Sequence, residues 1–429
     1  MPEFKTLRGM RDLMPEEAKM MIAIQSTARK TASLYGYKEI ITPVVESYDL
    51  LAAKAGDEVR SRMFTFKDLG QRDVALRPEF TASVARLVAT SLRNQPKPFR
   101  IFCMGSAYRY DEPQRGRYRE FWQSDYELIG TSRPEADVEI LLLTNRLMQD
   151  TGLKKYAMKI GHVGIVRGIL TKERVDDKEQ NAIMQLMDKK EYTAAINLLE
   201  KAGASEKSVN ILRQLVECKG NINSDILEKI GSLVGDYEKS AASLKNLEEI
   251  LELASSGDCK LDINVDAGFA RGLEYYTGMV FEVFIPQLDI ALGGGGRYDK
   301  LVELFGGEST PAVGVAHGLD RVMLSLQTQK TGIREGKEKT IFVFPISGEQ
   351  VAAAMKISQL LRDSGITVET EVMGRKMTKA LEDADRRGIG YAIIVGEHEL
   401  KEESVVIRDL EKREQRTIKI GKILEELKI

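Results

Sequence analysis

The sequence predicts an α+β core with a mostly antiparallel sheet, an all-helical insertion, and a smaller C-terminal α/β domain. Strand-like segments of the first part follow one another without regular helical crossovers. From about 164 to 257 the pattern changes to Lys, Glu, Leu and Ile at helical spacing. The last part alternates strand and helix patterns, which is typical of a mainly parallel sheet. We therefore expect residues 1–163 and 258–328 to form the core, 164–257 the insertion, 329–338 a linker and 339–429 the C-terminal domain.

The expected core begins with an amphipathic helix from Pro15 to about Tyr35, which Gly36 closes. Strands are then expected at YKEIITPVVES, MFTFKD, VALRPE, IFCMGSAYRY and EFWQSDYELIG, each bounded by polar turns. The helical segments are TASVARLVATSL and ADVEILLLTNRLMQD. After the insertion, strand patterns resume at LDINVDAG and MVFEVFI and lead into GGGGRYDKL. A helix, HGLDRVMLSLQ, then ends at the polar linker.

Composition shows neither a basic nor a membrane-spanning signature. The 63 Lys and Arg residues balance 65 Asp and Glu, and the formal net charge is −2. Any contact with nucleic acid must therefore come from local patches, because phosphate binding requires clustered positive charge. No apolar run approaches the roughly 18 residues that span a bilayer, and no secretory apolar segment opens the chain. We expect a cytoplasmic protein with no membrane partner.

Cysteine and histidine are too few and too widely spaced for a disulfide framework or a zinc centre. They are Cys103, Cys218, Cys259, His162, His317 and His398. We therefore expect reduced thiols and no metal held by the protein, zinc included.

The segment from Phe99 to Gly130 is the strongest candidate for chemistry. One strand delivers Arg109, and the turn DEPQRGR projects Arg115 and Arg117. A face that combines guanidinium, aromatic and amide groups suits a nucleotide. Taken alone, the pattern also describes a surface hairpin with solvated charges. The period of two along the second strand places four side chains on one face: Arg119, Phe121, Gln123 and Asp125.

The same segment resembles motif 2 of class II aminoacyl-tRNA synthetases in its histidyl form, whose loop reads R-x-E-x-P-Q-x-G-R-x-R-x-F-x-Q. We assign its positions to Arg109, Glu112, Pro113, Gln114, Gly116, Arg117, Arg119, Phe121 and Gln123. So many matches outweigh the interpretation as a plain surface hairpin.

Further segments resemble motifs of the same family, in the family's order. YGYKEIITPVVE is similar to motif 1, which forms the dimer interface, and LRPEFTASVAR to the loop that holds the α-amino group of the amino acid. ARGLEYYTGMVFEV and GGGGRYDKL resemble the two histidine-specific motifs, and AVGVAHGLDRVML resembles motif 3. The C-terminal domain is similar to the anticodon-binding domain of class II enzymes. Two departures, Glu274 for a common Asp and Phe80 for a common Gly, affect the expected shape of the pocket rather than the reaction.

The resemblance implies an enzyme that activates L-histidine with ATP and Mg²⁺ and transfers it to tRNA(His). Adenylate formation requires placement of the carboxylate and positive charge on the phosphate, and no nucleophilic side chain. Arg109 and Arg271 are implied at the α-phosphate, with Gln123 beside them as the third catalytic residue. The implied ATP-binding residues are Arg109, Glu112, Arg117, Phe121 and Arg321, with Phe121 stacked on adenine.

The implied histidine-binding residues are Glu79, Thr81, Gln123, Glu127, Arg271, Tyr275, Tyr276 and Tyr298. Glu79 and Thr81 would hold the α-ammonium, while a carboxylate and a phenol would serve the two ring nitrogens. The loop Gln114–Arg115–Gly116 is implied to contact the acceptor end of the tRNA. Without the resemblance, Tyr275 and Tyr276 would be interpreted as ordinary core side chains. The glycines at 293–296 would be interpreted as positions where another part of the backbone or a ligand approaches closely.

Two alternatives share this scaffold. One is the non-catalytic paralogue that regulates ATP phosphoribosyltransferase, which typically lacks the arginine of the first histidine-specific motif and the anticodon domain. The other is a class II synthetase for another amino acid, which would lack ARGLEYY together with GGGGRYD. This chain has Arg271 and the C-terminal domain, so we favour the histidyl enzyme.

Overall fold

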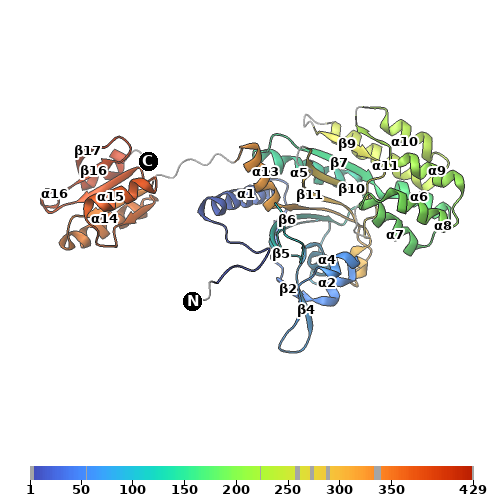
Figure 1. The fold of residues 1–429 in the computed structure, drawn as a ribbon, viewed down its shortest axis with the longest axis horizontal. Helices are drawn as coiled ribbons and strands as arrows, with labels where there is room; N and C mark the ends of the chain where they lie inside the picture. Colours follow the sequence, from blue (N-terminus) through green and yellow to red (C-terminus); the bar gives the residue numbers. More distant parts are fainter. Residues whose placement is uncertain are drawn as a thin grey trace. The chain divides into compact units, whose positions relative to one another are not determined.

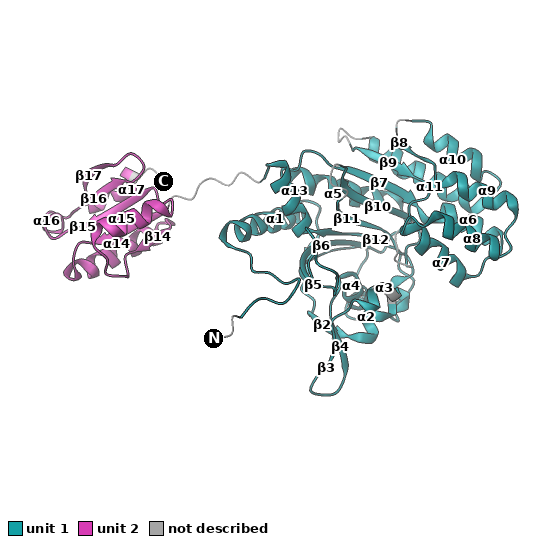
Figure 2. Cartoon of the chain, viewed as in Figure 1, with its two compact units in different colours: residues 1–333 teal, residues 334–429 magenta. Residues whose placement is uncertain are grey.

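The chain folds into two compact units, residues 1–333 and 334–429 (Figure 2). The structure, a computed structural model, describes residues 4–54, 56–222, 224–256, 261–270, 275–286, 290–332 and 340–427. Within these residues, no helix has the length and apolar character needed to cross a bilayer. The expected boundaries at 163/164 and 257/258 do not separate compact units and stay predictions.

A nine-stranded sheet organises the first unit (Figure 1). Its strand order is β1-β5-β6-β12-β11-β10-β7-β9-β8. Only the β1–β5 and β7–β9 pairs are parallel, so the prediction of a mostly antiparallel sheet is confirmed. The strands are β1 (Lys38–Glu39), β5 (Phe99–Tyr108), β6 (Glu120–Ile129), β7 (Ala157–His162), β8 (Lys219–Asn221), β9 (Ile263–Asp266), β10 (Met279–Ile285), β11 (Ile290–Arg297) and β12 (Ala312–Gly318).

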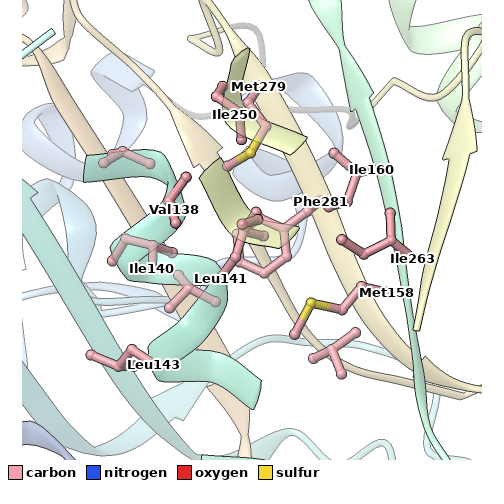
Figure 3. Close-up of a cluster of buried hydrophobic side chains, with 14 of the residues drawn as sticks. Val138, Ile140, Leu141, Leu143, Met158, Ile160, Ile250, Ile263, Met279 and Phe281 are labelled. Atoms are coloured by element: carbon pink, nitrogen blue, oxygen red, sulfur yellow. The ribbon is translucent and has the colours of Figure 1, made fainter. Parts of the chain in front are cut away.

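Long helices cover one face of this sheet and bury its largest apolar core. Helix α1 begins with Pro15 at its first turn, and Gly36 adopts the left-handed φ of +77° just after its end. Figure 3 shows apolar side chains of α5 meeting Met279 and Phe281 of β10. The helices of this layer are α1 (Pro15–Leu34), α5 (Pro134–Asp150), α11 (Glu238–Ser255) and α13 (Leu319–Gln329).

The other face carries a second core around α4 (Thr81–Ala89), which includes Ile101, Ile129, Val280 and Tyr298 of the sheet strands and the residues beside them. Next to α4 lies a three-stranded sheet with two short helices. These elements are β2 (Val45–Ser47), α2 (Tyr48–Lys54), α3 (Asp57–Ser61), β3 (Thr65–Lys67) and β4 (Asp73–Leu76). The short helix α12 (Leu301–Leu304) packs on α4.

The stretch after β7 is helical except for β8, a short strand that pairs with β9 and that the sequence pattern does not predict. Three-residue edge strands with a central Gly carry no alternation to reveal them. Helix α11 packs against α5 as well as α6, so the stretch shares a core with the large sheet. Its other helices are α6 (Val163–Lys172), α7 (Asp177–Asp188), α8 (Tyr192–Lys201), α9 (Glu206–Leu215) and α10 (Ile226–Val234).

The second unit is a five-stranded sheet in the order β14-β13-β15-β16-β17, with β13 parallel to both of its neighbours. The predicted β-α-β-α-β succession and the following hairpin are present. The elements are β13 (Ile341–Pro345), a 3₁₀ turn (Gly348–Gln350), α14 (Val351–Asp363), β14 (Val368–Thr370), α15 (Met377–Arg386), β15 (Tyr391–Val395), α16 (Glu397–Lys401), β16 (Ser404–Asp409), β17 (Glu414–Lys419), a second 3₁₀ turn (Ile420–Lys422) and α17 (Ile423–Leu427).

Two histidines are buried in the first unit, and both should make its stability depend on pH. His317 on β12 lies between the Ser124 carbonyl and the Thr144 hydroxyl, and His162 caps α6. Burial lowers the pKa of each imidazole from 6.5 to about 4. The unfolded chain therefore binds more protons between these pH values, so stability falls as pH drops from 6.5 toward 4. Each histidine should contribute a loss of up to about 3 kcal/mol.

This prediction can be checked by urea unfolding at pH 7 and pH 5, with the one tryptophan, Trp122 on β6, as fluorescent reporter. We expect His317→Gln to lower stability at pH 7 but to flatten the change between the two pH values. Equal pH dependence of the variant and the original chain would show that His317 does not carry the effect.

Candidate active site

A pocket of about 520 Å³ opens on the face of the large sheet that carries α4. Residues from β6, β11 and β12 form its floor, and the turn between β5 and β6 forms one wall. The structure thus brings together candidates that lie far apart in the sequence. The predicted residues that line it are Glu79, Thr81, Arg109, Gly116, Arg117, Phe121, Gln123, Glu127, Tyr275, Tyr276, Tyr298 and Arg321.

The β5–β6 hairpin presents the first two arginines. The Nε of Arg109 donates to the Pro78 carbonyl at 2.9 Å, and its guanidinium carbon lies 5.5 Å from the centre of the Phe121 ring. Beyond it, the Nε of Arg117 pairs with Asp111 at 2.8 Å. Asp111 also pairs with Arg62 at 3.1 Å, which fixes this carboxylate between two cations. The hairpin therefore holds both guanidinium groups by defined partners at the pocket wall.

Arg321, at the start of α13, completes a cluster of positive charge. Its Nη1 donates to the Ala291 carbonyl at 2.8 Å, and its Nε approaches the Gly116 carbonyl at 3.4 Å. Burial, and then the charges of Arg117 and Arg109, lower the pKa of the Arg321 guanidinium. An anion bound among the three arginines would relieve this repulsion. The cluster is therefore suited to a polyphosphate.

Tyrosines and a carboxylate form the opposite end of the pocket. The Tyr298 hydroxyl donates to Glu127, and both side chains are buried. The Tyr275 ring packs against Tyr276 at 4.7 Å between centroids and edge-on against Tyr298 at 5.7 Å. Burial, and next the charge of Glu127, raise the pKa of Tyr298 well above its ordinary value, so the phenol stays protonated. This end offers a carboxylate acceptor and phenol groups to a polar ring.

Glycines allow the strands of the floor to carry these side chains. A Cβ on Gly314 of β12 would lie 1.6 Å from the Glu127 carboxylate, so only glycine at position 314 leaves room for the Glu127 side chain. On β11, a Cβ on Gly295 would lie 1.9 Å from the Gly314 carbonyl, and one on Gly296 would lie 3.0 Å from the Tyr276 ring. The glycine run thus serves close packing of backbone and ring around the pocket, and Gly293 and Gly295 line it themselves.

Between the two ends lie groups suited to an amino acid. Glu79 and Thr81, both buried, stand just before and at the start of α4. Gln123 of β6 is also buried, and its side-chain oxygen has no hydrogen-bond partner among the described residues. Buried polar groups are normally satisfied, so this one is expected to face a ligand. A ligand with an ammonium, a carboxylate and a polar ring fits this sequence of groups.

Comparisons with known proteins identify the family of this chain. A family model described as histidyl-tRNA synthetase matches residues 9–322, and a model described as anticodon binding domain matches residues 340–428. The chain belongs to the histidyl-tRNA synthetase family. The histidine–tRNA ligase of Methanocaldococcus jannaschii is 40% identical over 98% of each chain. That of Sulfolobus acidocaldarius is 37% identical over 99% of this chain and 98% of its own.

Solved structures agree in fold. A histidyl-tRNA synthetase from a Nostoc species superposes with a TM-score of 0.79 at 23% identity, covering 100% of this chain and 99% of its own, which shows the fold alone. A protein from Bacillus halodurans described as an ATP phosphoribosyltransferase regulatory subunit/histidyl-tRNA synthetase has a TM-score of 0.77 at 26% identity. It covers 92% of this chain and 100% of its own.

Some residues predicted from the family pattern lie elsewhere. Glu112 is exposed and pairs with Arg8 at 2.6 Å, whereas Asp111 lines the pocket. The family pattern places its acidic residue two positions after the arginine, and this position is Asp111 in the chain rather than the assigned Glu112. Gln114 and Arg115 are exposed at the tip of the turn, outside the pocket. Arg271 and Glu274 lie outside the described residues.

The expected shared face can apply only within β6, which excludes Arg119. Phe121, Gln123 and Glu127 line the pocket, but Asp125 does not. Arg119 precedes the strand, donates to the Asp111 carbonyl and stacks 3.6 Å from the centre of the Tyr110 ring. The period of two applies only where the backbone is extended, and β6 begins at Glu120.

Several pocket residues were not predicted. Gln185, Asp188 and Lys189 come from the end of α7, in the helical stretch, and Arg62 follows α3. No local sequence pattern indicates that the end of α7 or the residue after α3 lies at the pocket. Two others had a signal, because Asp320 and Glu282 stand inside the quoted segments AVGVAHGLDRVML and ARGLEYYTGMVFEV.

Proposed function

We propose that this chain activates L-histidine with ATP, forming histidyl-adenylate and pyrophosphate, and then transfers histidine to the 3′ end of tRNA(His). The observation that carries the proposal is a single pocket in which three arginines face a buried Glu127–Tyr298 pair. The first end matches the charge of ATP, and the second matches the hydrogen bonds of an imidazole. Membership of the family makes these two ligands the expected pair.

In the first step, a carboxylate oxygen of histidine attacks the α-phosphorus of ATP, and pyrophosphate leaves. The residues of this chain orient the two reactants and neutralise the charge that develops on the phosphate. We assign Arg109 and Arg271 to the α-phosphate, and Arg117 and Arg321 to the β- and γ-phosphates. Phe121 supports adenine through its ring. No side chain acts as a nucleophile.

Histidine is recognised by buried hydrogen-bonding groups, which a ligand of the same shape without its polar atoms would leave unpaired. Glu79 and Thr81 hold the α-ammonium, and Gln123 contacts the carboxylate region. Glu127 accepts one ring N–H, and Tyr276 serves the other nitrogen, while Tyr275 and Tyr298 close the site. Buried polar groups of this kind reject a ligand that leaves them unpaired, by up to roughly 10⁴-fold.

Mg²⁺ is expected to accompany ATP, and Glu282 of β10 fits it. Its carboxylate lines the pocket together with Arg321, and its negative charge raises the pKa of that guanidinium, against the larger lowering effects. Among the described residues, no three His, Cys, Asp or Glu side chains are grouped to hold a metal. Mg²⁺ on ATP needs only one or two protein carboxylates, because phosphate and water complete its shell. Glu282 is the residue that we expect to hold Mg²⁺, which would neutralise phosphate charge there. The absence of zinc stays a prediction.

Transfer requires the tRNA to reach the same pocket. We assign Gln114, Arg115 and Gly116 to the acceptor end, since the first two are exposed at the tip of the turn. The second unit is assigned to the anticodon, where single-stranded bases can be read individually. In this step a hydroxyl of the terminal ribose attacks the histidyl carbonyl, and AMP leaves. The cytoplasmic location stays a prediction from the sequence.

ATP–pyrophosphate exchange, measured with each of the twenty amino acids, tests the proposal. Exchange with histidine alone would support both the activation step and its specificity. Folded protein that exchanges with no amino acid would favour the regulatory paralogue, and exchange with another amino acid would favour a different synthetase. The match of residues 340–428 to an anticodon-binding model gives the paralogue no support.

A homodimer is proposed through the segment that resembles motif 1. Ile41 is 94% exposed, and Val44 and Val45, which follow it in the same segment, are exposed too. Ile41→Glu should weaken the dimer by about 100-fold or more, because a two-fold interface buries the new charge twice. Sedimentation velocity would measure this, with Leu253→Glu on α11 as a control that should remain dimeric. A dimer that persists in Ile41→Glu would place the interface elsewhere.

A further inference from the structure

The opening segment of the chain, residues 4–14, docks against the motif 2 hairpin before α1 begins. The Arg119 N–H donates to the Gly9 carbonyl at 2.8 Å. Gly9 has a φ of +84°, and a Cβ there would lie 2.7 Å from the Arg119 side chain. The position therefore requires glycine, both for its conformation and for its space. This docking delivers the next arginine, Arg11, to the rim of the pocket.

Arg11 bridges two elements that carry candidate phosphate ligands. Its Nη1 donates to the Tyr118 hydroxyl at 2.7 Å, and its guanidinium carbon lies 3.8 Å from the centre of the same ring. Its Nη2 pairs with Asp320 at 2.5 Å. Tyr118 directly follows Arg117, and Asp320 directly precedes Arg321. The Arg11 guanidinium thus connects a residue next to Arg117 with a residue next to Arg321.

The bridge is largely shielded from water and anchored at its far end. The Asp320 side chain is 5% exposed and that of Arg11 is 23% exposed. The second oxygen of Asp320 accepts the Trp122 N–H of β6 at 2.6 Å. Burial raises the pKa of Asp320, against the opposing effects of the Trp122 N–H and Arg11. Arg11 is therefore the countercharge of a buried carboxylate that lies beside the three-arginine cluster.

We propose that Arg11 is a positioning residue for adenylate formation. By joining Tyr118 to Asp320, it fixes the motif 2 turn relative to α13 and so sets the spacing of Arg117 and Arg321. Both arginines contact ATP only under the proposed function, on which this inference rests. The histidine end is built on other elements, so its binding should depend little on Arg11. A lysine cannot reproduce the bridge, because a single ammonium lacks the planar fork that stacks on Tyr118 while it pairs with Asp320.

The test is steady-state pyrophosphate exchange with histidine in the full-length enzyme. We expect Arg11→Gln to lower kcat by about 10- to 100-fold, the effect of a misplacement near 1 Å, while KM for histidine changes little. Arg11→Lys should recover part of kcat. Tyr118→Phe removes one hydrogen bond of the bridge without burying an unpaired charge, so it should fold and lower kcat in the same direction but less. The control is Arg146→Gln, which removes the exposed Arg146–Asp150 pair on α5, away from the pocket.

The outcomes separate the inference from the proposed function. An original enzyme that shows no exchange with histidine would remove the proposed function itself. With exchange established, kcat of Arg11→Gln within about threefold of the original would overturn the positioning role. A rise in KM for histidine as large as the fall in kcat would overturn it too, because general loosening of the fold affects both ends of the pocket. If Arg11→Gln does not fold, Arg11→Lys and Tyr118→Phe decide by the same criteria.

Discussion

Replacing Arg109 with glutamine should lower histidine-dependent pyrophosphate exchange by about 10³-fold. The Pro78 carbonyl holds Arg109 at 2.9 Å, and Phe121 lies beside its guanidinium, so the positive charge is placed before ATP binds. A group fixed in this way stabilises the charge that develops on the α-phosphate without reorganisation. Glutamine keeps a polar amide on a shorter side chain but removes the charge.

The effect should be confined to the activation step. Transfer of histidine from preformed adenylate, measured in a single turnover, should change far less, because the α-phosphate is then the leaving group rather than the centre under attack. Arg100→Gln is the matched control. It lies at the other end of the same strand, pairs with Glu139 at 2.7 Å, and lines no part of the pocket. An equal loss in both steps would remove Arg109 from the α-phosphate.

What could be predicted from the sequence depended on local geometry. The alternation along the second motif 2 strand predicted that Phe121 and Gln123 share a face, and both line the pocket. The helix from Pro15 and its closing Gly36 follow from the fixed φ of proline and the left-handed conformation of glycine. Such features need no knowledge of distant contacts, because each is decided within a few residues.

The missed features depend on contacts between distant segments. Lys189 reaches the pocket from a helix that follows β7, and the Arg11–Asp320 pair spans 309 positions. No periodicity in either segment indicates a partner so far away. For the same reason, the sequence does not indicate a structural role for Arg297 within GGGGRYDKL, although it predicts its neighbour Tyr298 in the histidine site. The structure gives Arg297 a partner 160 positions earlier, Asp137 of α5.

The second large effect is therefore expected from a residue that does not line the pocket. Arg297 and Asp137 form a buried ion pair, with side chains 7% and 1% exposed. Arg297 also donates to the Thr131 carbonyl at 3.0 Å and pairs with Asp299 at 3.2 Å. The bond to Asp137 ties the end of β11 to α5, and the bond to Thr131 ties it to the segment just before α5. Tyr298 follows Arg297 directly, so these bonds help to hold it beside Glu127. Removing Arg297 leaves the Asp137 charge buried and uncompensated, and removing Asp137 leaves Arg297 only the partly exposed Asp299 as a countercharge. Breaking a buried pair in this way typically costs about 3–5 kcal/mol.

Asp137→Leu and Arg297→Met should each lower the free energy of unfolding of the first unit by about 3–5 kcal/mol, measured by urea unfolding with Trp122 fluorescence. The double variant Asp137→Leu/Arg297→Met leaves no buried charge in the pair and replaces it with apolar groups, so it should recover most of the loss. Additive losses in the double variant would mean that each residue acts through other contacts. The KM for histidine of the double variant tests a second role of the pair, which is to place Tyr298 for the substrate. If stability recovers but this KM stays raised, the ion pair stabilises the fold through its charges and positions Tyr298 through its geometry.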